Sequence, residues 1–101
     1  MDKIGVTEVR KILLEVLSEY TGLCEGLASM ESIPDEKLLK TNLRDEFGMD
    51  SLDFEDMFDE LYNLYGIVVD THNTLAEYSF NKEQTVENFI DTVNYHLSIG
   101  A

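Results

Sequence analysis

The sequence predicts an all-α fold, a small bundle of three long helices and one short helix with a long loop between the first and second. Two observations support this prediction. Apolar residues recur at helical spacing in three separate stretches, and the β-branched run at residues 67–69 has no second strand candidate to pair with. The 101 residues are expected to form one domain, residues 1–101, around a single modest core.

The first predicted helix is followed by a long connection. Helix-spaced apolar residues define the helix: Val6, Val9, Ile12, Leu13, Val16, Leu17 and Tyr20. Thr21 and Gly22 end it, and the connection from Leu23 to Phe47 contains the only proline of the chain, Pro34. We expect short helical turns near residues 23–30 and 35–39. Three apolar residues are expected to pin this connection to the core: Ile33, Leu38 and Leu43.

A second amphipathic helix is predicted from Ser51 to Gly66, because glycine is a common residue after a helix C-terminus. Residues 67–69 are expected to lead into the core as extended chain. A short helix around residues 75–78 follows, and Thr85 then caps the last long helix. The apolar stripes of the second and last helices are Phe54, Met57, Phe58, Leu61, Leu64 and Tyr65, and Val86, Phe89, Ile90, Val93 and Leu97.

Charge restricts the classes of partner. Seven basic and 21 acidic residues give a net charge of −14, which disfavours nucleic acid and anionic membranes and favours basic protein surfaces. A chain this small lacks room for a deep catalytic cleft, so we expect a partner or substrate of enzymes and not an enzyme. The absence of a signal-like or bilayer-length apolar segment, and a single cysteine, Cys24, predict a cytoplasmic monomer that does not insert into membranes.

The stretch from Gly48 to Asp53 carries the main functional signal. It places Ser51 at a predicted helix N-terminus, where the dipole and the free N–H groups of the first turn are expected to hold a phosphate ester. An ordinary capping role explains a serine and aspartate there equally well. His72 and His96 lack metal-ligand spacing, so we predict no metal site and expect exposed or capping histidines.

Asp50, Ser51 and Leu52 resemble the Asp-Ser-Leu motif of acyl carrier proteins, whose serine carries 4'-phosphopantetheine. Residues 9–13 are similar to the first helix of that family, residues 42–53 to the approach to its second helix, and residues 85–91 to the start of its fourth. The resemblance covers most of the chain. It implies an acyl-carrier-type bundle that carries acyl groups as thioesters on an arm attached to Ser51, for a specialised fatty-acid or polyketide-type pathway.

The resemblance also implies partners. These are a phosphopantetheinyl transferase and acyl-transferring or condensing enzymes with basic docking surfaces. Asp50, Asp53 and Asp56 agree in type with recognition residues of the family, whereas Glu60 joins the acidic cluster by composition alone, together with Glu55 and Asp59. Asp56 and Glu60 repel each other at i, i+4 spacing, and contact with a basic partner would relieve that repulsion.

Alternatives remain at this stage. The aspartate before Ser51 favours an acyl carrier over a peptidyl carrier, which commonly has histidine there. An unmodified acidic adaptor with the same fold is a further alternative, whereas an EF-hand starting at Asp45 fails because Asp50 stands where glycine is needed. Bulky residues such as Phe58, Tyr65 and Phe89 are expected to fill a well-packed core rather than leave a tunnel for an acyl chain.

Overall fold

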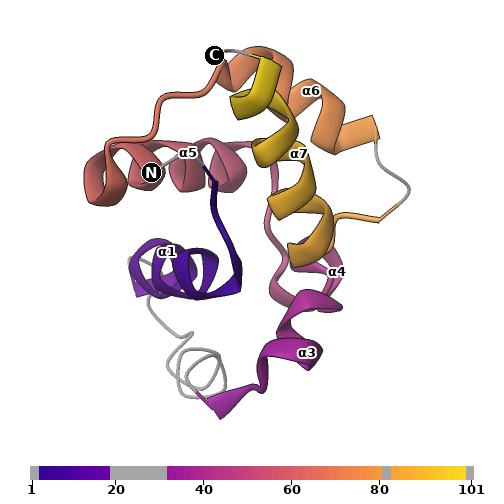
Figure 1. Ribbon diagram of the computed structural model, residues 1–101. Coiled ribbons are helices and arrows are strands. Elements are labelled where there is room, and N and C mark those ends of the chain that lie inside the picture. The colour runs from indigo at the N-terminus through magenta and orange to yellow at the C-terminus, as the bar shows by residue number, and fades with distance from the viewer. Residues whose placement is uncertain (1–2, 19–31, 81–82, 100–101) are drawn as a thin grey trace.

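The computed structural model describes residues 3–18, 32–80 and 83–99. Within these ranges the chain forms six helices and no strand: α1 (Val6–Ser18), α3 (Asp35–Leu39), α4 (Leu43–Phe47), α5 (Ser51–Tyr65), α6 (Thr71–Phe80) and α7 (Val86–Ile99) (Figure 1). The predicted all-α bundle is confirmed, with α1, α5 and α7 as the long helices and α6 as the short one. Cys24 and the turn expected near residues 23–30 lie outside the described residues.

The connection before α5 is more helical than expected. The turn expected at residues 35–39 is α3, and α4 was not predicted. The Asn42 amide oxygen caps α4 by accepting the N–H groups of Arg44 and Asp45 at 3.0 and 2.9 Å, and the Asn42 N–H donates to the Glu46 carboxylate at 2.8 Å. Gly48, in the left-handed region with φ +65°, ends this helix. Caps at both ends therefore define a helix of only five residues.

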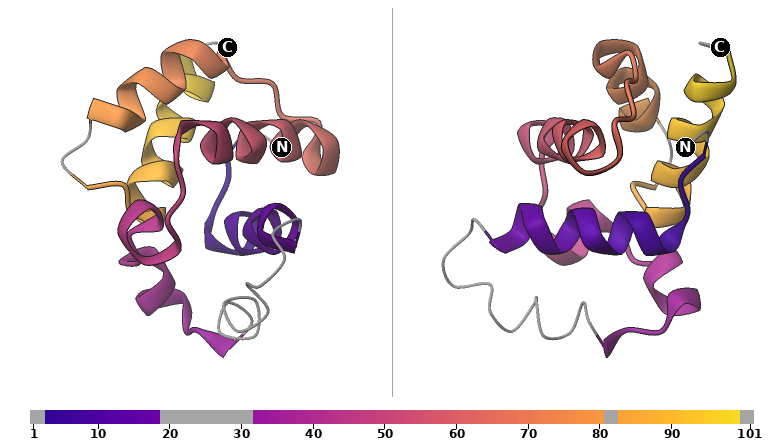
Figure 2. Two further views of the ribbon diagram at one scale, coloured as in Figure 1. Left: turned by 180° about the vertical axis from the view of Figure 1, so that it is seen from behind. Right: turned by 60° about the vertical axis from the view of Figure 1, so that its left-hand side comes forward.

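The long helices cross steeply around one core. In Figure 1, α5 runs across the view and α7 stands upright, and Figure 2 shows α7 steeply inclined to α1 as well. Helix α1 packs against α5 and α7, and α6 packs against the same two helices. The buried apolar residues form one cluster: Ile4, Val9, Ile12, Leu13, Val16, Leu38, Leu43, Met49, Phe54, Met57, Phe58, Leu61, Ile67, Tyr78, Val86, Phe89 and Val93.

Two polar links fix the segment that leads to α5. The Leu43 N–H donates to the Gln84 carbonyl at 2.8 Å and the Val86 N–H to the Thr41 carbonyl at 3.0 Å. These bonds form a single antiparallel bridge that holds the start of α4 beside the start of α7. The Arg10 guanidinium donates to the Ile33 carbonyl and the Asp35 carboxylate, each at 2.7 Å, and so ties α1 to the start of α3.

Several local predictions are confirmed. Gly66 follows α5 in the left-handed region with φ +67°, and residues 67–69 belong to no helix or strand, with Ile67 buried and Val68 exposed. The Thr85 hydroxyl accepts the Asn88 N–H at 3.2 Å at the start of α7. The predicted anchors also reach the core, since Leu38 and Leu43 are buried and Ile33 is partly buried against them.

Candidate functional site

A reciprocal capping box fixes the start of α5. The Asp50 carboxylate accepts the N–H groups of Leu52 and Asp53 at 3.0 and 3.2 Å, and the Asp53 carboxylate accepts the Asp50 N–H at 3.0 Å. Gly48 lets the chain turn before it, and the buried Met49 side chain anchors the turn to the core. The backbone on both sides of Ser51 is therefore held in place.

Ser51 is the first residue of α5 and is exposed. Its hydroxyl makes no hydrogen bond to any residue that the structure describes, so the capping role belongs to Asp50 and Ser51 is not the cap. Two of the first-turn N–H groups that were expected to hold a phosphate on Ser51 donate to the Asp50 carboxylate instead.

Leu52 lies next to Ser51 and is 70 % exposed. It falls outside the apolar stripe of α5, which explains its exposure. Glu55 and Asp59 are exposed farther along the helix, and Asp56 and Glu60 are half-buried. The outer surface of α5 therefore combines one protruding apolar side chain beside the serine with acidic side chains over the next two turns.

Asp53 differs from the other predicted partner-binding residues. Asp53 is only 9 % exposed, and its carboxylate accepts a hydrogen bond from the Asp50 N–H. The Asp50-x-x-Asp53 spacing is a recognisable capping-box signature, so the sequence contained this signal. The geometry favours a structural role for Asp53 within the site, whereas Asp50, Asp56 and Glu60 retain surface available to a partner.

The acidic charge is unevenly distributed along the chain. Residues 1–44 contain eight acidic and six basic residues, a net charge of −2. Residues 45–101 contain 13 acidic residues and a single lysine, which gives −12 of the total −14. Ser51 and the whole of α5 belong to the strongly acidic part, which favours basic partner surfaces at this site.

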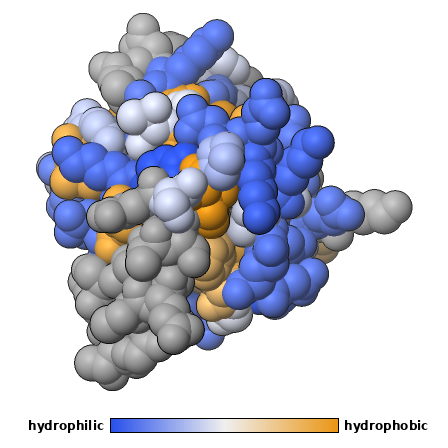
Figure 3. Space-filling model, turned by 90° about the horizontal axis from the view of Figure 1, so that it is seen from below, coloured by the Kyte–Doolittle hydropathy of each residue, from blue (hydrophilic) through white to orange (hydrophobic). Residues whose placement is uncertain are grey.

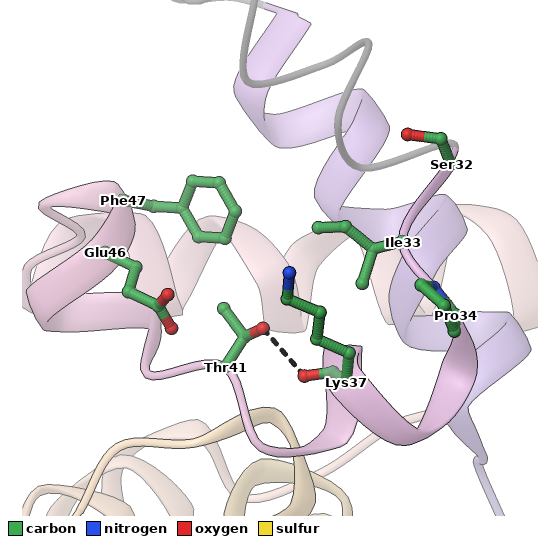
Figure 4. Close-up of a pocket in the computed structure, with 7 residues that line it drawn as sticks. All are labelled: Ser32, Ile33, Pro34, Lys37, Thr41, Glu46 and Phe47. Atoms are coloured by element: carbon green, nitrogen blue, oxygen red, sulfur yellow. Dashed lines mark hydrogen bonds between the residues drawn. The ribbon is translucent and has the colours of Figure 1, made fainter.

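A pocket of about 410 Å³ lies between α3 and α4, lined by Ser32, Ile33, Pro34, Lys37, Thr41, Glu46 and Phe47 (Figure 4). Two of its polar groups already have partners within the protein. The Thr41 hydroxyl donates to the Lys37 carbonyl at 3.0 Å, and the Glu46 carboxylate accepts the Asn42 N–H. Seen from below, the surface has a strip of apolar side chains among hydrophilic ones (Figure 3).

The two histidines lie on different helices, His72 on α6 and His96 on α7. His72 is exposed, as expected, but His96 is half-buried on α7 and contacts the Glu77 carboxylate of α6, so the exposed or capping role predicted for His96 is wrong. Its contact with another helix could not be read from local spacing. Among the described residues, no group of three or more His, Cys, Asp or Glu side chains is placed to hold a metal ion.

Comparisons of the chain with models of protein families, with curated protein sequences and with solved structures give no match. None of the helices in the described ranges combines the length and the apolar character needed to cross a membrane.

Proposed function

We propose that this chain is an acyl carrier whose Ser51 hydroxyl receives a 4'-phosphopantetheine arm inside a separate transferase. The observation that carries the proposal is the exposed Ser51 hydroxyl, free of hydrogen bonds to the described residues, at the first residue of the capped α5. The arm, once attached, supplies a terminal thiol that holds an acyl group as a thioester. The Asp-Ser-Leu motif and the helix order agree with this role.

The residues around Ser51 fit such an arm. The capping box between Asp50 and Asp53 fixes the backbone, so an incoming enzyme meets the backbone around Ser51 in one conformation. Leu52 offers an apolar contact immediately beside the attachment point. Because Asp50 occupies the nearest N–H groups, the protein leaves the arm outside its own surface, where it can reach successive enzymes.

Ser51 needs a partner for the attachment chemistry. A serine hydroxyl is a weak nucleophile unless a base removes its proton, and Ser51 hydrogen-bonds to no base in the described part of the chain. The transferase must therefore take the proton as the Ser51 oxygen attacks the coenzyme A pyrophosphate. A new O–P bond forms, the anhydride bond breaks, and adenosine 3',5'-bisphosphate leaves. This chain is thus the substrate of the step.

The acidic surface supports docking to basic enzymes. Glu55 and Asp59 project from α5, and Asp50, Asp56 and Glu60 add charge close to Ser51. Such charge speeds and orients encounters with a basic surface more than it tightens the final complex. We assign the carrier to a specialised fatty-acid or polyketide-type pathway, with acyl-transferring or condensing enzymes as later partners.

Intact mass spectrometry tests the proposal. The wild-type chain, Ser51→Ala and Ser79→Ala are incubated with coenzyme A and a broad-specificity phosphopantetheinyl transferase. Ser79 is the matched control because it is an exposed serine on α6. We expect the wild type and Ser79→Ala to gain one arm and Ser51→Ala to gain none. An unmodified wild type with several transferases, or a modified Ser51→Ala, would favour the unmodified adaptor instead.

A further inference from the structure

Four aromatic side chains join α5, α6 and α7 into one connected cluster. The Phe58 and Phe89 rings are stacked at a centroid distance of 5.5 Å and an interplanar angle of 20°. Tyr78 meets Phe89 edge-on at 5.5 Å and Phe54 edge-on at 5.0 Å. None of the four residues is more than 3 % exposed. Aromatic rings therefore fill the space where these three helices meet.

Hydrogen bonds hold Tyr78 in this cluster. Its hydroxyl donates to the Thr85 carbonyl at 3.0 Å, and that carbonyl also accepts the Phe89 N–H at 3.0 Å as α7 begins. The Gln84 amide donates to the Tyr78 carbonyl at 3.4 Å. If the Tyr78 ring moved aside, its hydroxyl would lose a buried partner and both edge-on contacts would be broken.

The cluster lies close to the proposed attachment point. Phe54 is three residues after Ser51 on α5, about one helical turn away. Because Phe54 is buried, its ring lies inside the bundle, whereas the serine is exposed. An acyl chain that entered between α5 and α6 from the Ser51 end would meet the Phe54–Tyr78 pair first. The pocket between α3 and α4 is a poor substitute for a long apolar chain, because Lys37, Thr41 and Glu46 belong to its lining.

We propose that this carrier leaves its acyl group outside the bundle and that its cargo is therefore a short or polar acyl group, not a long fatty chain. This inference rests on the function proposed above. A long alkyl chain outside the bundle would expose every methylene group to water, which is unfavourable. A short or charged acyl group exposes little apolar surface and has little to gain from burial. The closed packing of the four aromatic rings favours the second kind of cargo.

The test of this inference uses no transferase. Its failure can therefore be distinguished from a failure of the proposed carrier function. Cys24→Ser removes the natural thiol, and Ser51→Cys provides one at the attachment point. This thiol is alkylated with maleimide-linked pantetheine amides that end in acetyl, succinyl or octanoyl groups. Nuclear Overhauser contacts between the octanoyl methylenes and the rings of Phe54, Tyr78 and Phe89 are then measured, together with the melting temperature of each conjugate.

We expect no such contacts, and melting temperatures that agree among the three conjugates. Contacts from octanoyl to these rings, or an octanoyl conjugate that melts roughly 4–8 °C or more above the acetyl one, would overturn the inference. Phe89→Leu in the same conjugates gives the matched comparison, because a smaller side chain opens space beside Tyr78. Octanoyl contacts are expected in that variant. Phe58→Leu serves the same purpose if Phe89→Leu does not fold.

Discussion

Asn94 and Ile4 are joined by two hydrogen bonds across 90 residues of sequence. The Asn94 amide oxygen accepts the Ile4 N–H at 2.8 Å, and the Asn94 amide nitrogen donates to the Ile4 carbonyl at 2.9 Å. The side chain therefore pairs with one residue of extended chain as a neighbouring strand would. The Asn94 side chain thus ties the segment before α1 to α7, and the Ile4 side chain is buried in the core.

Replacing Asn94 by alanine is expected to destabilise the fold by about 1–3 kcal/mol, because both backbone groups of Ile4 lose their partners in a part-buried place. The change is read as a lower midpoint of urea denaturation. Asn63→Ala is the control, since Asn63 is exposed and makes one long contact of 3.5 Å with Glu60. Equal midpoints for the two variants would show that the Asn94 pairing contributes nothing.

Thr74 and Thr85 should respond oppositely to the same substitution. The Thr74 hydroxyl oxygen is buried and has no hydrogen-bond partner among the residues that the structure describes, whereas the Thr85 hydroxyl caps α7. Valine keeps the shape and removes the hydroxyl. Thr74→Val is therefore expected to leave stability unchanged or raise it, and Thr85→Val to lower it by about 1 kcal/mol. Thermal melts of both variants decide this, and a destabilised Thr74→Val would indicate a partner for that hydroxyl.

The buried Tyr78 phenol is expected to lower the free energy of unfolding at alkaline pH. Burial raises the pKa of the Tyr78 phenol above its ordinary value near 10. In the unfolded chain the phenol loses its proton near pH 10, while the native state keeps it, so the free energy of unfolding falls as pH rises above that point. Below pH 10 both states are protonated and the effect is absent. Urea titrations between pH 8 and 11 measure this dependence.

Tyr78→Phe is expected to lose stability less steeply with alkaline pH than the wild type, even if its stability at pH 8 is lower. Tyr65 gives the comparison, because partial burial and, to a smaller extent, the nearby Glu8 carboxylate raise its pKa as well. Since Tyr65 is only half-buried, Tyr65→Phe should change the slope less. A Tyr78→Phe slope equal to the wild-type slope would assign the alkaline loss to other groups.

Charge reversal on α5 should slow arm attachment. If Asp56 and Glu60 meet a basic surface of the transferase, Asp56→Lys and Glu60→Lys are expected to reduce the modification rate. The rate of the wild type should also fall as salt shortens the Debye length below about 10 Å. Glu87→Lys makes the same charge change at an exposed position of α7 and should have a smaller effect. Equal rates for all three variants would remove docking from this face of α5.

Sequence periodicity predicted the long helices because each buries one apolar stripe. It missed α4, whose two apolar residues, Leu43 and Phe47, are too few to define a period. The signals that did exist were local, namely a capping residue at Asn42 and a glycine at position 48. Contacts between distant segments were beyond such reasoning, and the pairing of Asn94 with Ile4 is one example.

The candidate site was predictable in part for the same reason. A helix that begins at Ser51 follows from the glycine before it and the apolar spacing after it, and the exposure of Leu52 follows from its place off that stripe. The use of the first-turn N–H groups did not follow. It depends on whether Asp50 or a phosphate occupies them, and the structure assigns them to Asp50.

The acidic and basic residues are unevenly divided among the described helices. Five of the six basic residues before residue 45 belong to α1, α3, α4 and the residue after α3, whereas α5, α6 and α7 contain no lysine or arginine. In the field of a basic enzyme, a tumbling chain would turn its acidic part forward before contact. Ser51 lies in that part, so fewer encounters would present the wrong end. Physiological salt would confine this guidance to about the last 8 Å of approach.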